Sequence, residues 1–136
     1  MPPPEGMPPA ARGWLRKFAD AFRGVFEAVR TQSSFAAHLP VAAAAVGLGW
    51  WLGISGVEWA LVAVAIGIVL AAEVFNTAIE SLARALDRGP DDRIRDALDE
   101  ASGAVCVAVG TAVVVGVVVF GPRLWAALGW PGSASG

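Results

Sequence analysis

The chain begins with an amphipathic segment, and three long apolar runs follow it. We place the runs at residues 35–53, 57–86 and 92–120, and each is long enough for a helix to cross a hydrocarbon core of about 30 Å. Between the first two runs, the segment Gly53–Gly56 holds two glycines and predicts a tight reversal. The pattern therefore predicts an all-α membrane protein with three transmembrane helices.

Residues 11–31 alternate apolar and charged positions with the period of a helix. The apolar positions recur at steps of three and four residues: Trp14, Leu15, Phe18, Phe22, Val25, Phe26 and Val29. A basic amphipathic helix with aromatic side chains is typical of the membrane interface. A helix docked on a protein surface is the alternative that this pattern leaves open.

The two ends of the chain differ in composition from its middle. Residues 1–10 are rich in proline and predict a disordered tail, and residues 131–136 predict a second flexible tail. The start lacks the apolar core and small-residue cleavage site of a signal peptide. Residues 11–130 are predicted to form a single membrane domain.

Composition and charge agree with a membrane protein and indicate its orientation. Hydrophobic residues make up 56% of the 136 residues and charged residues only 16%, which is too apolar for an ordinary soluble domain. Nine of the ten Lys and Arg residues precede residue 31 or lie within 84–95. The positive-inside rule then predicts a multi-pass protein with a cytoplasmic N-terminus. Because the basic residues only flank the spans, nucleic-acid binding is not expected.

Tryptophans near the other ends of the spans predict an aromatic belt at the opposite interface. They are Trp50, Trp51, Trp59, Trp125 and Trp130. The aromatic and basic signals are independent of each other and predict the same topology.

Polar residues interrupt the second run in a helical pattern. They fall at steps of three, one, three and four residues and so share one helical face. We name them the polar stripe: Glu73, Asn76, Thr77, Glu80 and Arg84. Ionisable groups at membrane depth are unfavourable by several kcal/mol each, which favours a functional interpretation. The structural alternative pairs Glu73 and Glu80 with Arg84 or Arg95 to hold helices together.

The third run adds a second polar face, since Arg95, Asp99, Ser102 and Cys106 fall along one side of its helix. Two facing helices with such groups can hold a divalent cation and phosphate oxygens, because Mg²⁺ favours one or two carboxylates together with substrate phosphates. A carboxylate beside a lipid hydroxyl can also assist its deprotonation. Cys106 is the only cysteine, which excludes an internal disulfide, and we expect it to be buried. His38 is expected at the interface rather than as a ligand.

The sequence of the polar stripe resembles a family signature. Residues 73–80, Glu-Val-Phe-Asn-Thr-Ala-Ile-Glu, closely resemble the E-x-x-N-S/T-A-I-E motif of the small bacterial integral-membrane diacylglycerol and undecaprenol kinases. Residues 21–24 (Ala-Phe-Arg-Gly), 35–39 (Phe-Ala-Ala-His-Leu) and 99–105 (Asp-Glu-Ala-Ser-Gly-Ala-Val) fit the same family in order. The resemblance covers residues 16–120, and the Phe–His–Leu pattern is more similar to the Gram-positive, undecaprenol-type branch.

The resemblance implies both an architecture and a reaction. It implies a homotrimer in the bacterial inner membrane, in which each subunit has an amphipathic surface helix and three transmembrane helices. The implied reaction is ATP- and Mg²⁺-dependent phosphorylation of a lipid hydroxyl, on diacylglycerol or undecaprenol, at the cytoplasmic interface. The subunits are expected to share their active sites.

The motifs also imply roles for individual residues. Glu73 matches the proposed general base, Asn76 the amide of the active site, and Asp99 the acidic residue of the third helix. Glu80 matches a metal-binding carboxylate, and Gln32 falls at the second metal-binding position. The residues implied for nucleotide binding are Arg16, Arg23, Arg95 and Asp99.

Three positions depart from the family pattern. Gln32 replaces a glutamate, Leu98 replaces a phosphate-binding lysine, and Arg84 replaces an acidic residue. Gln32 can still offer a neutral oxygen to Mg²⁺, and Arg95, one helical turn before Asp99, is the hypothesised replacement for the lysine. The departures leave two alternatives open. One is a weakened homologue that binds nucleotide or lipid without turnover, and the other is a non-enzymatic membrane scaffold or transporter subunit.

Overall fold

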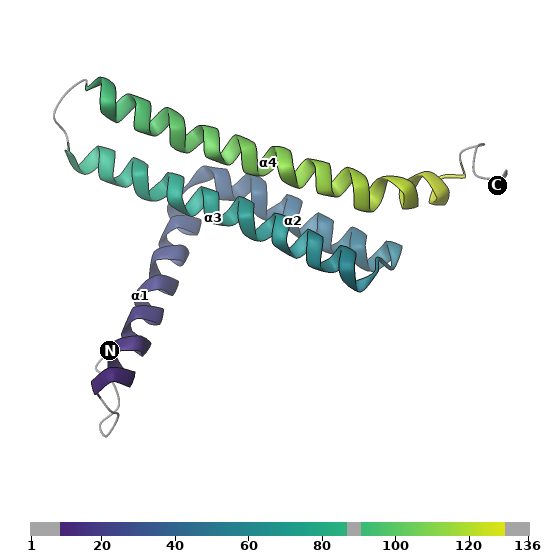
Figure 1. The fold of residues 1–136 in the computed structure, drawn as a ribbon, viewed down its shortest axis with the longest axis horizontal. Coiled ribbons are helices and arrows are strands. Elements are labelled where there is room, and N and C mark those ends of the chain that lie inside the picture. The colour runs from purple at the N-terminus through teal and green to yellow at the C-terminus, as the bar shows by residue number, and fades with distance from the viewer. Residues whose placement is uncertain (1–8, 87–90, 130–136) are drawn as a thin grey trace. The chain divides into compact units, whose positions relative to one another are not determined.

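A computed structural model describes residues 9–86 and 91–129, which form four α-helices (Figure 1). The helices are α1 (Pro9–Thr31), α2 (Ser33–Leu52), α3 (Gly56–Leu86) and α4 (Asp92–Ala127). The chain divides into two compact units: residues 1–32 contain α1, and residues 33–136 contain the other three helices. The last two residues of the predicted N-terminal tail are helical. The rest of that tail, the tail at 131–136 and Trp130 lie outside the described residues.

Among the described helices, α2, α3 and α4 are long and apolar enough to cross a membrane. With its 31 residues, α3 is about 46 Å long at about 1.5 Å per residue, whereas the hydrocarbon core measures about 30 Å. The last turns of a spanning α3 therefore extend beyond the core. The prediction of an all-α membrane protein with an N-terminal helix and three membrane-spanning helices is confirmed.

In the first unit, α1 pairs aromatic side chains with basic ones. The rings of Trp14 and Phe18 lie 6.3 Å apart, and the Lys17 ammonium lies 5.0 Å from the centre of the Trp14 ring. The Arg30 guanidinium lies 5.6 Å from the centre of the Phe26 ring. Such contacts let a basic side chain cover aromatic surface while its charge stays in water. The interfacial position of this helix stays a prediction.

The link between α2 and α3 is the tight reversal that its glycines predict. Gly53 has a φ of 60°, a left-handed conformation that residues with a Cβ rarely adopt. Beside the link lies a core of four buried side chains: Ile54, Val62, Val119 and Phe120. Gly49 also lies close to this core, and a Cβ at that position would meet the Trp59 ring at 2.9 Å. The reversal therefore depends on Gly53 for its backbone and on Gly49 for space.

Helix α4 is longer than the predicted helix of residues 92–120. The Asp91 carboxylate caps its first turn by accepting a 2.9 Å hydrogen bond from the backbone N–H of Arg93. At the other end, the helix continues through Pro122 to Ala127. A proline inside a membrane helix is tolerated where neighbouring groups form hydrogen bonds with the freed backbone groups. The helix therefore does not end at Pro122.

An ion pair joins the end of α4 to the start of α3. The Arg123 guanidinium donates to the Glu58 carboxylate, which also accepts a 2.7 Å hydrogen bond from the Ser55 backbone N–H.

We expect Glu58→Gln and Arg123→Gln each to lower the Tm of the purified protein by a few degrees, because each leaves one charge without its partner. Thermal unfolding in detergent measures this loss. The exchanged double variant, Glu58→Arg with Arg123→Glu, should recover part of it, and a double variant less stable than both single variants would contradict the pairing.

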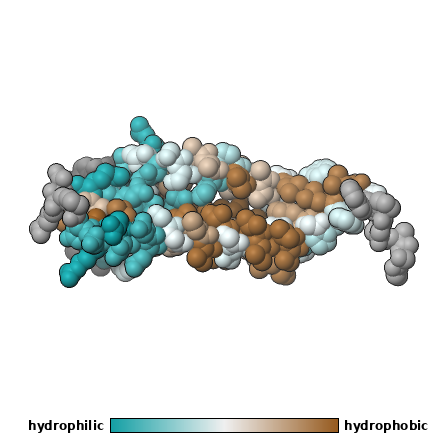
Figure 2. Space-filling view, turned by 90° about the horizontal axis from the view of Figure 1, so that it is seen from above, coloured by the Kyte–Doolittle hydropathy of each residue, from teal (hydrophilic) through white to brown (hydrophobic). Residues whose placement is uncertain are grey.

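Helix α3 packs against both α2 and α4, most extensively against α4. Its buried residues recur at steps of three and four: Val62, Ala65, Val69, Glu73 and Thr77. Hydrophilic surface gathers at the end of the second unit where α3 ends and α4 begins, and apolar surface covers much of the remainder (Figure 2). The buried row of α3 thus runs from the apolar part of the bundle toward its polar end.

Candidate functional site

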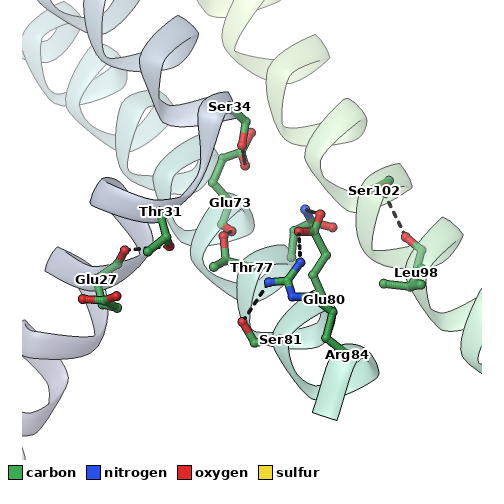
Figure 3. A network of polar contacts seen from close by, with 11 residues as sticks. Glu27, Thr31, Ser34, Glu73, Thr77, Glu80, Ser81, Arg84, Leu98 and Ser102 are labelled. Carbon is green, nitrogen blue, oxygen red and sulfur yellow. Dashed lines mark hydrogen bonds and ion pairs between the residues drawn. The ribbon is translucent and has the colours of Figure 1, made fainter. Parts of the chain in front are cut away.

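The carboxylate of Glu73 lies at the contact between α2 and α3, where only 2% of the residue is exposed. Its Oε1 lies 2.9 Å from Nε2 of His38. Its Oε2 accepts a 2.9 Å hydrogen bond from the Ser34 hydroxyl, and Figure 3 draws Ser34 beside Glu73. Thr77 donates to the backbone carbonyl of Glu73 at 2.8 Å. A buried carboxylate is unfavourable unless donors satisfy it, so α2 supplies the groups that make this position tolerable.

These partners differ from the ones expected from the sequence. The structural alternative paired Glu73 with an arginine, and His38 was expected at the interface rather than as a ligand. The sequence did not indicate that the imidazole of His38 contacts Glu73 directly. Ser34 and His38 stand four residues apart on α2 and so share one helical face, and α2 turns that face toward Glu73.

The rest of the polar stripe forms a chain of contacts along α3. Asn76 Nδ2 donates to Glu80 Oε1 at 2.9 Å, and Arg84 Nη1 lies 3.6 Å from Glu80 Oε2. Arg84 also donates to the Ser81 hydroxyl at 3.2 Å. Neighbours one turn away on either side therefore orient the Glu80 carboxylate. The Glu80 side chain remains 31% exposed, so a ligand can reach it.

An open cleft lies between α3 and α4. One side of it is formed by residues of the polar stripe and the other by residues of the third-helix motif. Helix α3 contributes Glu80 and Arg84, and α4 contributes Leu98, Asp99 and Ser102. Figure 3 draws Leu98 and Ser102 on the helix that faces Glu80, with the Ser102 hydroxyl donating to the Leu98 carbonyl at 2.9 Å. This α3–α4 cleft thus combines two carboxylates with one guanidinium.

Two other residues of the predicted α4 face lie elsewhere. The Arg95 guanidinium lies 3.1 Å from the Asp92 carboxylate on the same helix, and Arg95 does not line the described α3–α4 cleft. Cys106, which was expected to be buried, is exposed. The arginine in the cleft is Arg84, which belongs to the polar stripe and pairs with Glu80 as the structural alternative allowed.

The oxygens beside Glu80 suit a hard cation. Asn76 Oδ1 is buried and accepts no hydrogen bond from any described residue. Within residues 9–86 and 91–129, no three His, Cys, Asp or Glu side chains form a cation-binding cluster. Mg²⁺ does not require such a cluster, because one or two carboxylates, waters and substrate phosphates complete its octahedron. Glu80 and Asp99 line the cleft, and Asn76 Oδ1 belongs to the residue one turn before Glu80, so they offer the kinds of oxygen that Mg²⁺ takes when it arrives with a nucleotide.

An apolar cavity of about 380 Å³ lies among α2, α3 and α4. Small aliphatic side chains make up much of its wall, among them Ala42, Ala45, Ala65, Val69, Ala112 and Val113. His38 also lines this cavity, and the same side chain contacts Glu73. The cavity and the buried carboxylate therefore share a boundary, which suits a molecule with a hydrocarbon chain and a polar end.

Three predicted ligand residues belong to the first unit. Arg16 and Arg23 lie on α1, where the Arg23 guanidinium lies 3.6 Å from the Asp20 carboxylate. Gln32 follows α1 and donates its backbone N–H to the Ala28 carbonyl at 3.1 Å. The proposed roles of these residues toward nucleotide and metal stay predictions.

Comparison with known proteins identifies related sequences. The sequence profile of the family described as "Prokaryotic diacylglycerol kinase" matches residues 19–120. Undecaprenol kinase of Bacillus subtilis (strain 168) is 32% identical over 111 residues, which cover 82% of this chain and 90% of that protein. The profile match includes the Glu73 site and the α3–α4 cleft.

Proposed function

Because the chain belongs to the prokaryotic diacylglycerol kinase family, we propose that it transfers the γ-phosphoryl group of ATP to the hydroxyl of a membrane lipid. The reaction requires Mg²⁺, and the acceptor is diacylglycerol or undecaprenol. The observation that carries the proposal is the position of Glu73, a buried carboxylate next to an apolar cavity and about two helical turns from an oxygen-rich cleft.

The lipid side of the reaction involves Glu73 and the apolar cavity. A hydrocarbon chain lying along the cavity brings its hydroxyl toward His38 and Glu73. The Glu73 carboxylate then accepts the proton of that hydroxyl as the hydroxyl oxygen attacks the γ-phosphorus, and the bond from the γ-phosphorus to the bridging oxygen breaks so that ADP leaves. General-base assistance of this kind needs a carboxylate fixed at the acceptor oxygen, and its two donors on α2 support such fixation.

The nucleotide side of the reaction involves the α3–α4 cleft. Glu80, Asp99 and Asn76 Oδ1 would hold Mg²⁺, and the bound ion would neutralise charge on the transferring phosphates. Arg84 donates its guanidinium hydrogens to phosphate oxygens, which an arginine fork fits well. Phosphoryl transfer depends mainly on such positioning and charge neutralisation. A cleft with carboxylates and a guanidinium therefore has the groups that phosphoryl transfer needs.

The proposed location is the bacterial inner membrane, with the N-terminus and the α3–α4 cleft on the cytoplasmic side. Glu73 lies about 26 Å along α3 from Gly56 and Glu80 about 36 Å, at about 1.5 Å per residue. A hydrocarbon core of about 30 Å that begins near Gly56 would end between these two carboxylates. The exposed Trp50, Trp51 and Trp125 side chains support an opposite interface at the other end of the bundle.

The proposed assembly is a homotrimer in which neighbouring subunits share active sites. Two features of the single chain support an active site that a neighbouring subunit completes. Among the described residues, the α3–α4 cleft has Glu80 and Asp99 as its carboxylates, and Asp99 is exposed. The apolar side chains exposed along α4, such as Val107, Val113 and Val117, would pack against lipid or another subunit.

Purified protein in lipid vesicles provides the test of this function. The vesicles contain either diacylglycerol or undecaprenol, and chromatography separates the lipids after incubation with Mg²⁺ and radiolabelled ATP. Labelled phosphatidate or undecaprenyl phosphate is the expected product. Nucleotide-dependent stabilisation without any labelled lipid would instead support the weakened homologue. The absence of both effects would support the scaffold.

Arg84 and Arg95 are alternative cations for the nucleotide phosphates, and they make separable predictions. We expect Arg84→Ala to raise the KM for ATP by about tenfold or more, the usual effect of losing a hydrogen bond to a charged group. Arg95→Ala should change this KM by less than about twofold, because the Arg95 side chain is paired with Asp92 outside the cleft. Steady-state kinetics with saturating lipid measures both values. The reverse order of effects would assign the role to Arg95.

A further inference from the structure

His38 stands between the buried carboxylate and the apolar cavity. Its Nε2 lies 2.9 Å from Glu73 Oε1, and its side chain is 24% exposed, compared with 2% for Glu73. The Ser34 hydroxyl donates to the other carboxylate oxygen at 2.9 Å. One donor from α2 therefore binds each oxygen of the carboxylate, and the imidazole is the one that also borders the cavity.

Two fixed donors determine the orientation of a carboxylate that water does not reach. A buried carboxylate without donors is strongly unfavourable, and a carboxylate with one donor can still rotate about its last bond. The His38 imidazole is a rigid ring whose N–H direction follows from the position of α2. The Ser34 hydroxyl, by contrast, rotates freely about its own C–O bond. His38 is therefore the donor that fixes the plane of the Glu73 carboxylate.

We infer that His38 is a positioning residue: it donates its Nε2–H to Glu73 Oε1 and directs the free lone pairs of the carboxylate toward the acceptor hydroxyl in the cavity. The inference rests on the proposed function, in which Glu73 accepts the proton. Errors of about 1 Å in the placement of reacting groups lower rates by about a hundredfold. A donor that holds the base in place is thus expected to act on kcat rather than on nucleotide binding.

Three substitutions at position 38 separate positioning from simple packing. His38→Leu fills the space without a donor. His38→Gln places an amide N–H near the position of Nε2, whereas His38→Asn carries the same amide on a shorter side chain. We expect His38→Leu and His38→Asn to lower kcat by about ten- to hundredfold, the range for a lost hydrogen bond to a charged group. His38→Gln should recover most of the rate, and the KM for ATP should stay within about twofold in all three variants.

A second measurement does not depend on catalysis. His38 is the only histidine in the chain, so isotope-labelled histidine gives one set of ring-nitrogen NMR signals without assignment. We expect the signals of an Nε2–H imidazole that donates a strong hydrogen bond. Glu73→Gln should shift the Nε2 signal, while Glu80→Gln, on the same helix but outside this contact, should leave it in place.

The two measurements distinguish failure of this inference from failure of the proposed function. If Glu73→Gln leaves the ring-nitrogen signals unchanged, the contact is absent and the inference is overturned, whatever the activity. If the wild-type protein phosphorylates lipid and His38→Gln is as slow as His38→Leu, the N–H donor is not what matters, and the inference is again overturned. If the NMR signature is present but the wild type forms no lipid phosphate, the proposed function fails and the contact is only a link between α2 and α3.

Discussion

Glu73→Gln is expected to lower kcat for lipid phosphorylation by about 10²- to 10⁴-fold, the usual contribution of a positioned general base. Glutamine keeps the size of the side chain, and its carbonyl oxygen can still accept one of the two hydrogen bonds from α2. Its amide nitrogen cannot accept a proton from the substrate hydroxyl, and it faces a second donor where the carboxylate had an oxygen. The loss should therefore appear in kcat, with the KM for ATP little changed, since the α3–α4 cleft is intact.

Glu73→Asp is the matched control for this substitution. Aspartate keeps the charge and the basic oxygen atoms but withdraws them by one methylene group from His38 and Ser34. An activity between those of the wild type and Glu73→Gln is expected. A Glu73→Gln variant with close to the wild-type kcat would show that another group accepts the proton, and Glu73 would then be a structural partner of α2.

Glu80→Gln is expected to raise the Mg²⁺ concentration needed for half-maximal activity by about tenfold or more. The estimate is conservative, because the loss of groups that only support metal ligands already weakens metal sites by about 10- to 100-fold. The substitution removes the negative charge beside the Asn76 amide, whose nitrogen donates to Glu80 and whose buried oxygen has no hydrogen-bond donor among the described residues. It also leaves the Arg84 guanidinium without its carboxylate partner.

The matched control is Glu58→Gln, the same substitution near the other end of the same helix. Glu58 pairs with Arg123 far from the cleft, so its loss should lower the Tm and leave the Mg²⁺ dependence unchanged. Titration of activity with Mg²⁺ at fixed ATP compares the two variants. If Glu80→Gln and the wild type respond to Mg²⁺ alike, Glu80 is not a ligand. The non-enzymatic scaffold predicts that Glu80→Gln is tolerated altogether.

The fold was largely predictable because membrane helices are visible as long apolar runs. The reversal at Gly53 and the helix start near Asp91 followed from turn and capping chemistry. The extension of α4 past Pro122 was not predicted from the sequence. It accompanies an ion pair between Glu58 and Arg123, which lie 65 positions apart. A contact of that kind depends on how α3 and α4 pack together and has no local signature.

The polar contacts within α3 were predictable from the sequence, whereas the contacts between helices were less so. The spacing of Glu73, Asn76 and Glu80 placed them on one face, and the contact between Asn76 and Glu80 agrees with that spacing. The contact of His38 with Glu73 was not predicted, because α2 is apolar around most of its circumference, and such a helix gives little indication of which face meets its neighbour. Arg84 was placed on the same face and named as a possible partner of Glu80, and the 3.6 Å approach of the two side chains agrees with their spacing of four residues.

The central claim is that the polar stripe of α3 is the active site of a Mg²⁺-dependent lipid kinase. The most direct measurement is the rate at which the wild type and Glu73→Gln transfer label from ATP to lipid in identical vesicles, with Mg²⁺ and with a chelator. The account predicts a labelled lipid phosphate from the wild type that disappears with the chelator, and little or none from the variant. Equal rates for the two proteins, or transfer by the wild type that persists with the chelator, would contradict it.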